Sequence, residues 1–260
     1  MSVAAQIDDV SFAHSSVDAP ALAHVSLSLP AGGIVALLGP SGAGKTTLLT
    51  LLDGRLRDWR GRVSVLGGSL DPDYPPPRAL RPDTGFVFQE FALVERSTVL
   101  RNVFNGRLGR MSPLRAFLGS PTERDIQVAR SALDDCGISD LADRRVDSLS
   151  GGQRQRVAIA RCLAQEPRLI LADEPVSNLD PTRAAEILTL LTEAARARGA
   201  TVLFSSHQPE LARRFAQRIV GMRDGRIAFD VPVSDLSEDA AADLYRDAAQ
   251  MSGTGLKVVT

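Results

Sequence analysis

The chain has 260 residues, 44% of them hydrophobic and 23% charged, which suits one large globular domain with a buried core. Its formal net charge of −1 provides no overall basic field, so nucleic acid is not an expected partner. Asp8 and Asp9 fall where a secretory signal would need an apolar core, and no apolar run approaches the roughly 20 residues that span a bilayer. We therefore expect a cytosolic chain that reaches a membrane only through partner proteins.

The first part of the chain alternates strand and helix signals. An apolar run over residues 32–39 ends in glycine and predicts a buried strand, and leucines over 45–53 predict a helix directly after it. Residues 61–67 and 84–89 predict further strands. Between these two, residues 71–82 are predicted to be irregular, because consecutive prolines lack N–H donors and fix φ.

The middle of the chain, from residue 97 to 166, is mostly helical in pattern and predicts an inserted helical subdomain. Its residues 106–124 mix arginines with apolar residues and helix breakers, which indicates either a solvated loop or a surface that faces a partner. Cys136 and Cys162 lie in helix-like segments, so we expect reduced core residues rather than a disulfide or a metal pair.

The α/β alternation returns after Pro167. Residues 168–173 and 201–206 predict strands, with a helix over 181–198 between them. The dipeptide at 224–225, Asp-Gly, predicts a hairpin within residues 218–229. From residue 237 an amphipathic helix and then a disordered end are expected. The sequence has no internal repeat and a single phosphate-loop motif.

That motif is GPSGAGKTT at residues 39–47, which fits the phosphate-loop pattern between a predicted strand and a predicted helix. Glycines let backbone N–H groups turn inward around phosphates, and the helix N-terminus adds positive potential. Lys45 is expected to reach the β- and γ-phosphates of ATP, and the Thr46 hydroxyl to bind Mg²⁺.

Two carboxylates follow the apolar strand LILA. Asp173 is placed to hold Mg²⁺ through water, and Glu174 to act as the general base that polarises the attacking water. His207 follows the strand TVLFSS at the edge where parallel sheets carry their sites, so it is a candidate for contacting the γ-phosphate. A lone histidine or a carboxylate pair more often has a structural role. The phosphate loop in the same chain is what favours a catalytic role for these three residues.

The sequence LSGGQ at residues 149–153 predicts a second helix start with free N–H groups. One ATP needs only one phosphate loop, so this second anion site is unexplained within one subunit. It is explained if it covers the ATP of another copy, which gives a symmetric homodimer with two sandwiched sites.

Together these motifs resemble the ATP-binding-cassette (ABC) ATPase family over residues 5–235. The resemblance implies an α/β fold with a P-loop (RecA-like) core sheet and an inserted helical subdomain, the ABC-type nucleotide-binding domain. It divides the chain into a first core part at 1–90, a helical subdomain with the signature motif at 91–167, a second core part at 168–236 and a tail at 237–260.

The resemblance also implies site roles. Glu174, His207 and Lys45 would be catalytic, and Thr46, Gln89 and Asp173 would bind the metal. Asp180, in the segment 177–180, would lie at the dimer interface. The residues implied in binding ATP are Gly39, Pro40, Ser41, Gly42, Ala43, Gly44, Lys45, Thr46, Thr47, Gln89, His14, Ser150, Gly151, Gly152, Gln153 and Asp180.

The adenine contact departs from the family pattern, which has an aromatic residue where this chain has His14. Phe12 is the other candidate for stacking on adenine, but its alternation with Val10 indicates a core strand residue.

The segments 84–110 and 207–230 are similar to the phosphonate-importer branch of the family. This resemblance implies an ATPase subunit at the cytoplasmic face of a bacterial inner membrane, bound to two permease subunits and supplied by a periplasmic phosphonate-binding protein. Phosphite, phosphate esters, polar amino acids and lipoprotein release stay open as alternative cargo. An ATPase acting on DNA or ribosomes would carry long coiled coils or two cassettes, and a relic module would lack Lys45 or Glu174.

Overall fold

The computed structural model describes residues 2–14, 19–78, 80–177 and 179–246. Its central element is a six-stranded sheet in the order β10-β9-β3-β8-β7-β6. All neighbours are parallel except the β9–β10 hairpin. The strands are β3 (Ile34–Leu38), β6 (Thr84–Val87), β7 (Leu169–Ala172), β8 (Thr201–Ser206), β9 (Arg218–Arg223) and β10 (Arg226–Pro232).

These strands confirm the predicted ones, and β3, β7 and β8 are buried along their whole length. Parallel strands covered on both faces need apolar residues at every position rather than at alternate ones, which is why the sequence shows continuous apolar runs. The carboxyl ends of β3, β7 and β8 lie at one edge of the sheet, where α/β proteins place their ligands.

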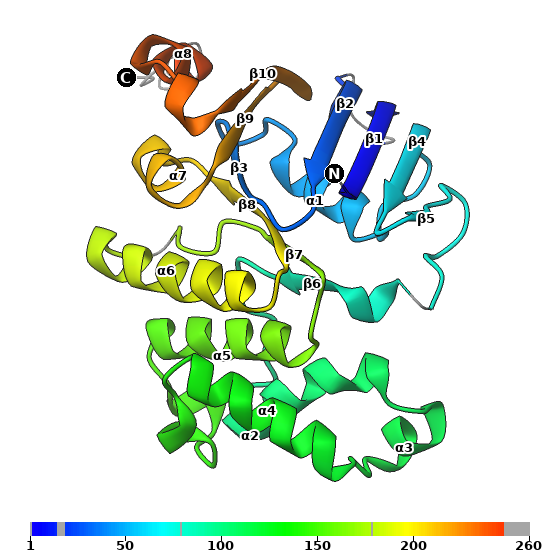
Figure 1. Ribbon diagram of the computed structural model, residues 1–260, viewed down its shortest axis with the longest axis vertical. Coiled ribbons are helices and arrows are strands. Elements are labelled where there is room, and N and C mark those ends of the chain that lie inside the picture. The colour runs from blue at the N-terminus through cyan, green and yellow to red at the C-terminus, as the bar shows by residue number, and fades with distance from the viewer. Residues whose placement is uncertain (1, 15–18, 79, 178, 247–260) are drawn as a thin grey trace, which may run out of the picture.

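A second, antiparallel sheet was predicted only in part: its strand near residues 61–67 was expected, and the alternation of Val10 and Phe12 indicated a second strand. Its order is β2-β1-β4-β5. The strands are β1 (Val3–Phe12), β2 (Leu22–Pro30), β4 (Arg60–Val65) and β5 (Gly68–Ser69). Helix α1 (Lys45–Leu52) lies beside β1 and β2 in Figure 1. Its leucines belong to one buried cluster with residues of both sheets. This helix therefore fixes the phosphate loop between two layers.

The middle of the chain is helical, as predicted, and lies below the central sheet in Figure 1. Helix α5 (Gly151–Ala164) packs against α2 (Val99–Phe104) and α4 (Glu123–Asp135) of this region and against α6 (Pro181–Ala197). The chain also forms α3 (Pro113–Leu118) and 3-10 turns at η1 (Arg81–Asp83), η2 (Asn105–Arg110), η3 (Ser139–Leu141) and η4 (Val146–Ser148).

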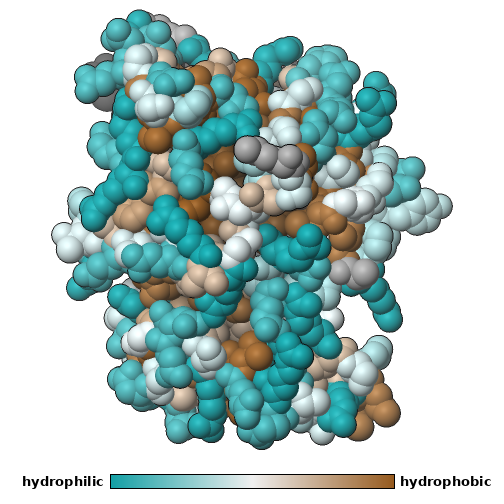
Figure 2. Space-filling view, viewed as in Figure 1, coloured by the Kyte–Doolittle hydropathy of each residue, from teal (hydrophilic) through white to brown (hydrophobic). Residues whose placement is uncertain are grey.

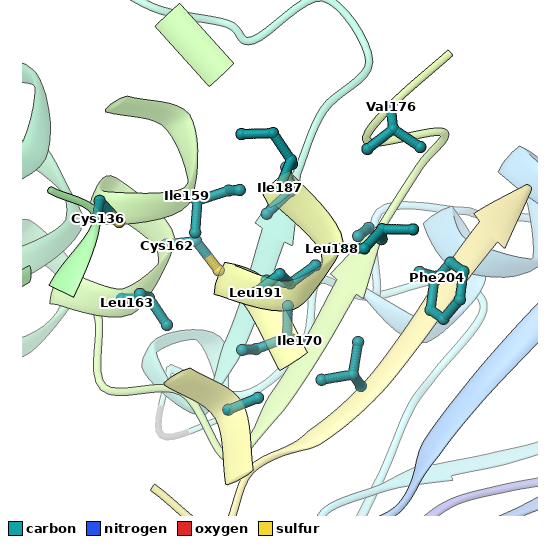
Figure 3. Close-up of a cluster of buried hydrophobic side chains, with 14 of the residues drawn as sticks. Cys136, Ile159, Cys162, Leu163, Ile170, Val176, Ile187, Leu188, Leu191 and Phe204 are labelled. Carbon is teal, nitrogen blue, oxygen red and sulfur yellow. The ribbon is translucent and has the colours of Figure 1, made fainter. Parts of the chain in front are cut away.

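Both cysteines are free and buried, as predicted, in the cluster that joins α5 and α6 to the sheet (Figure 3). Burial raises the pKa of Cys136 and of Cys162 to about 12, so both thiols are protonated at neutral pH. They act as small apolar residues in this core.

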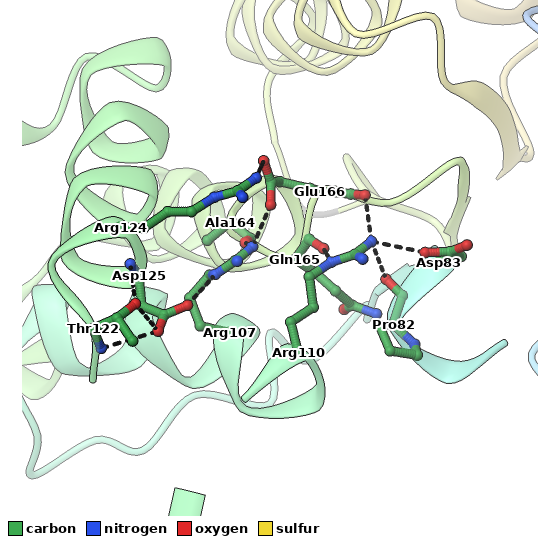
Figure 4. A network of polar contacts seen from close by, with 10 residues as sticks. All are labelled: Pro82, Asp83, Arg107, Arg110, Thr122, Arg124, Asp125, Ala164, Gln165 and Glu166. Atoms are coloured by element: carbon green, nitrogen blue, oxygen red, sulfur yellow. Dashed lines mark hydrogen bonds and ion pairs between the residues drawn. The ribbon is translucent and has the colours of Figure 1, made fainter. Parts of the chain in front are cut away.

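The segment 106–124 divides into two parts that behave differently. Arg107 is 3% exposed and bonds to Asp125, to the Ala164 carbonyl and to Glu166 (Figure 4). Arg110 bonds to the Gln165 carbonyl and to other groups of the core. A solvated loop is therefore wrong for Arg107, whereas Leu108, Gly109 and Arg110 are exposed. Both arginines tie the insertion to the end of α5.

The second part, helix α3, places its apolar side chains in water. Leu114, Phe117 and Leu118 are 68%, 88% and 64% exposed, and brown atoms mark this region at the lower right of Figure 2. The interpretation of this part as a partner-facing surface stays a prediction.

The end of the described chain forms α7 (Pro209–Phe215), η5 (Val233–Asp235) and α8 (Glu238–Tyr245). Helix α8 confirms the expected amphipathic helix, because Ala241 and Leu244 are buried in the main core cluster. The expected disordered end lies outside the described residues. None of the helices in the described ranges is both long and apolar enough to cross a bilayer.

Candidate ATP-binding and hydrolysis site

The phosphate loop connects β3 to α1, as its sequence context predicts. Two of its glycines are required by close backbone approach. A Cβ on Gly39 would lie 2.3 Å from the Met222 carbonyl oxygen, and one on Gly44, whose φ is +98°, would lie 2.4 Å from the Ala21 oxygen. The loop is thus held against β9 and against the start of β2 by contacts that any side chain would break.

Lys45 is the buried cation of the site, with 5% of its surface exposed. Its Nζ donates to the carbonyl oxygens of Gly39 and Pro40 at 2.7 and 3.0 Å, and lies 3.7 Å from Oε1 of Glu174. Burial lowers the pKa of Lys45, and the carboxylates of Glu174 and Asp173 offset part of this effect. The ammonium therefore lies between the loop and the carboxylates, where phosphate charge is expected.

The two acidic residues follow β7, and both bond to a serine that was not predicted from the sequence. The Ser205 hydroxyl, on the adjacent strand β8, donates to Oδ1 of Asp173 at 2.8 Å and accepts from the Glu174 N–H at 2.7 Å. Asp173 is buried, and Glu174 has a φ of +41°. The only sequence signal for this role is that the buried strand TVLFSS ends in two hydroxyl residues.

His207 follows β8, and its Nδ1 lies 3.6 Å from Oε2 of Glu174. The structure thus brings together Lys45, Asp173, Glu174 and His207 from three strand ends. A buried cation, a buried carboxylate, a base and an imidazole at one edge can hold a polyphosphate and activate water beside it.

The signature sequence forms the N-terminus of α5, as predicted. Ser150 is the N-cap and makes a reciprocal capping box with Gln153. A Cβ on Gly151 or Gly152 would meet nothing within 4 Å. The fold of this chain alone therefore does not require glycine at either position.

A second residue that the sequence analysis did not identify joins this helix to the catalytic segment. The Gln155 side chain is buried and donates to the Pro175 carbonyl at 2.6 Å, one residue after Glu174. Because Gln155 lies one turn into α5, this bond links the signature helix to the strand end that carries the two carboxylates.

The structure does not bring the remaining predicted residues into contact with this cluster. Gln89 is exposed and lies beyond the end of β6. Asp180 caps α6 and accepts a hydrogen bond from the Arg183 N–H at 3.1 Å. Phe12 packs against the core and meets the exposed His14 edge to face at 4.9 Å, so Phe12 has less surface than His14 to offer to a base. Their roles stay predictions.

Comparisons with known proteins agree with this geometry. The model of the ABC transporter family matches residues 22–177. A phosphonates import ATP-binding protein, PhnC, from Thiobacillus denitrificans is 46% identical over 208 residues, which cover 80% of each chain. A protein of the same name from Nitratidesulfovibrio vulgaris is 45% identical over 208 residues, covering 80% of this chain and 78% of that protein.

Solved structures give the same fold. A dimeric, post-hydrolysis structure of the ATP-binding cassette MJ0796 with ADP and Pi has a TM-score of 0.74 at 29% identity, covering 88% of this chain and 98% of that one. The cbiO1 protein of Clostridium perfringens, part of the ABC transporter complex cbiONQ, has a TM-score of 0.79 at 26% identity and covers 97% and 100%.

The phosphate loop after β3 and the carboxylate pair after β7 lie at the same edge of the sheet, an arrangement that defines a nucleotide-hydrolysing protein of the P-loop class. The family match is specific within that class. The chain belongs to the ABC transporter family and is an ATP-binding cassette ATPase, as the sequence motifs predicted.

Proposed function

We propose that this chain is the ATP-binding subunit of an importer for phosphonates. The assignment of phosphonates as cargo is supported by relatives that are 41–46% identical over about 80% of the chain. Their names assign them to phosphonate import. The proposal keeps the division of the chain at residues 90, 167 and 236. It places the subunit at the cytoplasmic face of a bacterial inner membrane, on two permease subunits supplied by a periplasmic binding protein.

In this proposal the hydrolysis step uses the cluster at the sheet edge. Lys45 releases the carbonyls of Gly39 and Pro40 and turns to the β- and γ-phosphates, which the loop N–H groups surround. Glu174 takes the proton of the attacking water, and His207 orients the γ-phosphate from the other side of that carboxylate. Ser205 holds the Asp173 carboxylate and the Glu174 backbone N–H during the step.

The residues present fit Mg²⁺. Thr46 and Asp173 offer hard oxygen donors, and Asp173 is buried with one oxygen already held by Ser205. Among the described residues no cluster of three or more His, Cys, Asp or Glu could hold a metal by itself. This suits Mg²⁺, which proteins usually bind through one or two side chains together with substrate phosphates. When bound, Mg²⁺ neutralises charge on the β- and γ-phosphates.

The homodimer is supported by the signature helix. Its capped N-terminus carries two glycines with open space around them, and the groove beside it is lined by Ser150, Gly152, Gln153, Leu179 and Arg183. No residue of the phosphate loop lines this groove. A second copy bound head to tail would bring its ATP to these N–H groups, with the segment around Asp180 at the contact.

The test is ATP hydrolysis by the chain reconstituted in vesicles with a phosphonate-type permease and its binding protein. We expect 2-aminoethylphosphonate to stimulate hydrolysis, and amino acids to leave it unchanged. Lys45→Ala, which removes the buried cation, provides the background rate. Stimulation by phosphite or by a phosphate ester alone would make that compound the cargo instead of phosphonates. A hydrolysis rate that none of these compounds changes would overturn phosphonate import, while the assignment as an ATPase would stand.

A further inference from the structure

Two consecutive residues in the loop after β6 have an unfavourable backbone conformation. Phe91 and Ala92 have φ values of +59° and +49°, in the left-handed region that favours glycine. Holding a residue with a side chain in this region costs free energy, so contacts from the rest of the protein must keep the pair there. Residues of this kind are frequent in active sites and in switch segments, which makes the contacts of this loop worth following.

The pair is held by Arg161, a half-buried residue of the signature helix α5. Its guanidinium donates one hydrogen bond to the Phe91 carbonyl at 2.8 Å and another to the Ala92 carbonyl. Because a guanidinium carries several N–H donors in a rigid plane, one arginine can bond two neighbouring acceptors at once. Arg161 therefore fixes both strained residues of the loop to α5.

The turn of α5 that carries Arg161 is itself packed tightly against the backbone on two sides. A Cβ on Gly106 of η2 would lie 2.1 Å from the Arg161 carbonyl oxygen, and one on Gly85 of β6 would lie 2.6 Å from Sγ of Cys162. Neither position has room for a side chain, and the helix has no room to shift toward η2 or β6. Arg161 thus reaches the loop from a fixed point.

The same loop begins at the sheet edge that carries the two acidic residues. In the parallel pairing of β6 with β7, Val87 lies opposite Ala172, and the Asp173 N–H donates to the Val87 carbonyl at 2.9 Å. Gln89 follows two residues after Val87 and directly precedes the segment that Arg161 holds. The backbone of Gln89 is therefore attached on one side to the strand beside Asp173 and on the other side to Arg161.

We propose that Arg161 is a positioning residue for ATP hydrolysis, which fixes the backbone of residues 91–92 to the signature helix and thereby places Gln89 at the edge that carries Asp173. Without the guanidinium, residues 91–92 relax to an ordinary backbone conformation, and Gln89 loses its position at that edge. The proposal rests on the proposed role of Gln89 at the metal ion or the attacking water.

The first test compares Arg161→Met with Arg213→Met in the full-length chain. Methionine keeps an unbranched apolar side chain but donates no hydrogen bond. Arg213 is the matched control, because this half-buried arginine also donates to the carbonyl of a distant residue, Leu236, at 2.7 Å. We expect kcat for ATP to fall about tenfold in Arg161→Met with KM within about twofold, because misplacing a reacting group costs rate more than binding. Arg213→Met is expected to keep both wild-type values.

Arg161→Lys keeps the positive charge but replaces the planar fork by a single ammonium. Its kcat is expected to lie between those of Arg161→Met and the wild type, and this variant carries the test if Arg161→Met does not fold. A wild-type kcat in both Arg161 variants would overturn the proposal.

A double-mutant cycle with Gln89→Ala separates positioning from a general structural role. If Arg161 acts through Gln89, Arg161→Met should lower kcat little in a chain that already has alanine at position 89, so the two effects are not additive. The same fall in both backgrounds would mean that Arg161 is structural, and would overturn the proposal. A wild-type kcat in Gln89→Ala alone would also overturn it, whereas full hydrolysis by Lys45→Ala would refute the ATP site itself.

Hydrogen exchange of the chain without nucleotide provides a readout besides activity. The Phe91 N–H donates to the Phe88 carbonyl at 3.1 Å, and the Ala92 N–H to the Glu90 carbonyl at 2.6 Å. Both amides are expected to exchange faster in Arg161→Met, because the turn they close loses its support, while amides of β7 keep the wild-type rate. Wild-type exchange at residues 91–92 would show that the guanidinium does not hold the loop, and would overturn the proposal even if kcat fell.

Discussion

The hydroxyl of Ser205 donates a hydrogen bond to the carboxylate of Asp173 at 2.8 Å, across the boundary between β8 and β7. The same oxygen accepts the Glu174 N–H at 2.7 Å, so one side chain fixes two consecutive acidic residues. Glu174 has a backbone φ of +41°, which costs a non-glycine residue about 1 kcal/mol or more. The Ser205 contact is what supports that conformation.

Ser205→Ala is therefore expected to lower the free energy of unfolding by about 1–3 kcal/mol, because it leaves a buried carboxylate oxygen and a backbone N–H unsatisfied. It should also raise the Mg²⁺ concentration needed for half-maximal hydrolysis. Urea titration and a Mg²⁺ titration measure the two effects. Ser206→Ala provides the matched control, because the Ser206 hydroxyl bonds only to the Gln208 backbone. Equal Mg²⁺ requirements in the two variants would contradict the role of Ser205.

Glu174→Gln is expected to bind ATP but to lose turnover, since an amide cannot take the proton of the attacking water. ATP would then hold the closed dimer, which gel filtration detects as a shift from monomer to dimer only when ATP is present. Lys45→Ala should weaken ATP binding instead, because the loop loses its buried cation. Normal hydrolysis by Glu174→Gln would remove this residue from the role of base.

Gly151→Ala and Gly152→Ala are expected to leave the chain as stable as wild type or to stabilise it by up to about 1 kcal/mol, because alanine is the better helix former and both sites have room for a Cβ. Hydrolysis should nevertheless fall, because the added methyl would meet ATP or the partner subunit. Gly39→Ala is the contrast, since its Cβ would lie 2.3 Å from a carbonyl oxygen and must destabilise the fold. Thermal melting and ATPase assays together decide this, and full activity in both signature variants would count against the sandwiched site.

The two buried thiols predict a loss of stability in alkali. In the unfolded chain they ionise near pH 9.0, whereas burial in the folded chain keeps them protonated until about pH 12. The folded state therefore binds more protons in that window, and the free energy of unfolding falls as pH rises through it, by at most about 1.4 kcal/mol per pH unit for each thiol. At pH 8 a thiol reagent should react slowly with the native chain and with two thiols after denaturation. Fast labelling of the native chain would contradict the burial of Cys136 and Cys162.

The sequence predicted the central sheet well because its strands are buried on both faces and appear as continuous apolar runs. The antiparallel sheet was harder to predict. Its β1 and β2 alternate buried and exposed residues irregularly, with register shifts near Val10 and positive φ at Asp9 and His24. These bulges interrupt the period of two on which strand prediction depends.

The candidate site also contains some residues that could be predicted from the sequence and others that could not. Lys45, Asp173, Glu174 and His207 belong to motifs or follow predicted strands, so their convergence at one sheet edge could be predicted from sequence. Ser205 and Gln155 act through contacts between segments far apart in the chain. A serine in a strand and a glutamine in a helix give no local signal of such contacts.

The bond from Gln155 to the Pro175 carbonyl has a further consequence for the proposed dimer. In that dimer the signature helix of each subunit would cover the ATP of its partner, yet this bond ties the helix to the segment after Glu174 of its own subunit. Rearrangement around Glu174 at one site would therefore shift the helix that covers the other site. ATP bound at one site would therefore change the properties of the other site. Hydrolysis would then depend on ATP concentration with a Hill coefficient above one.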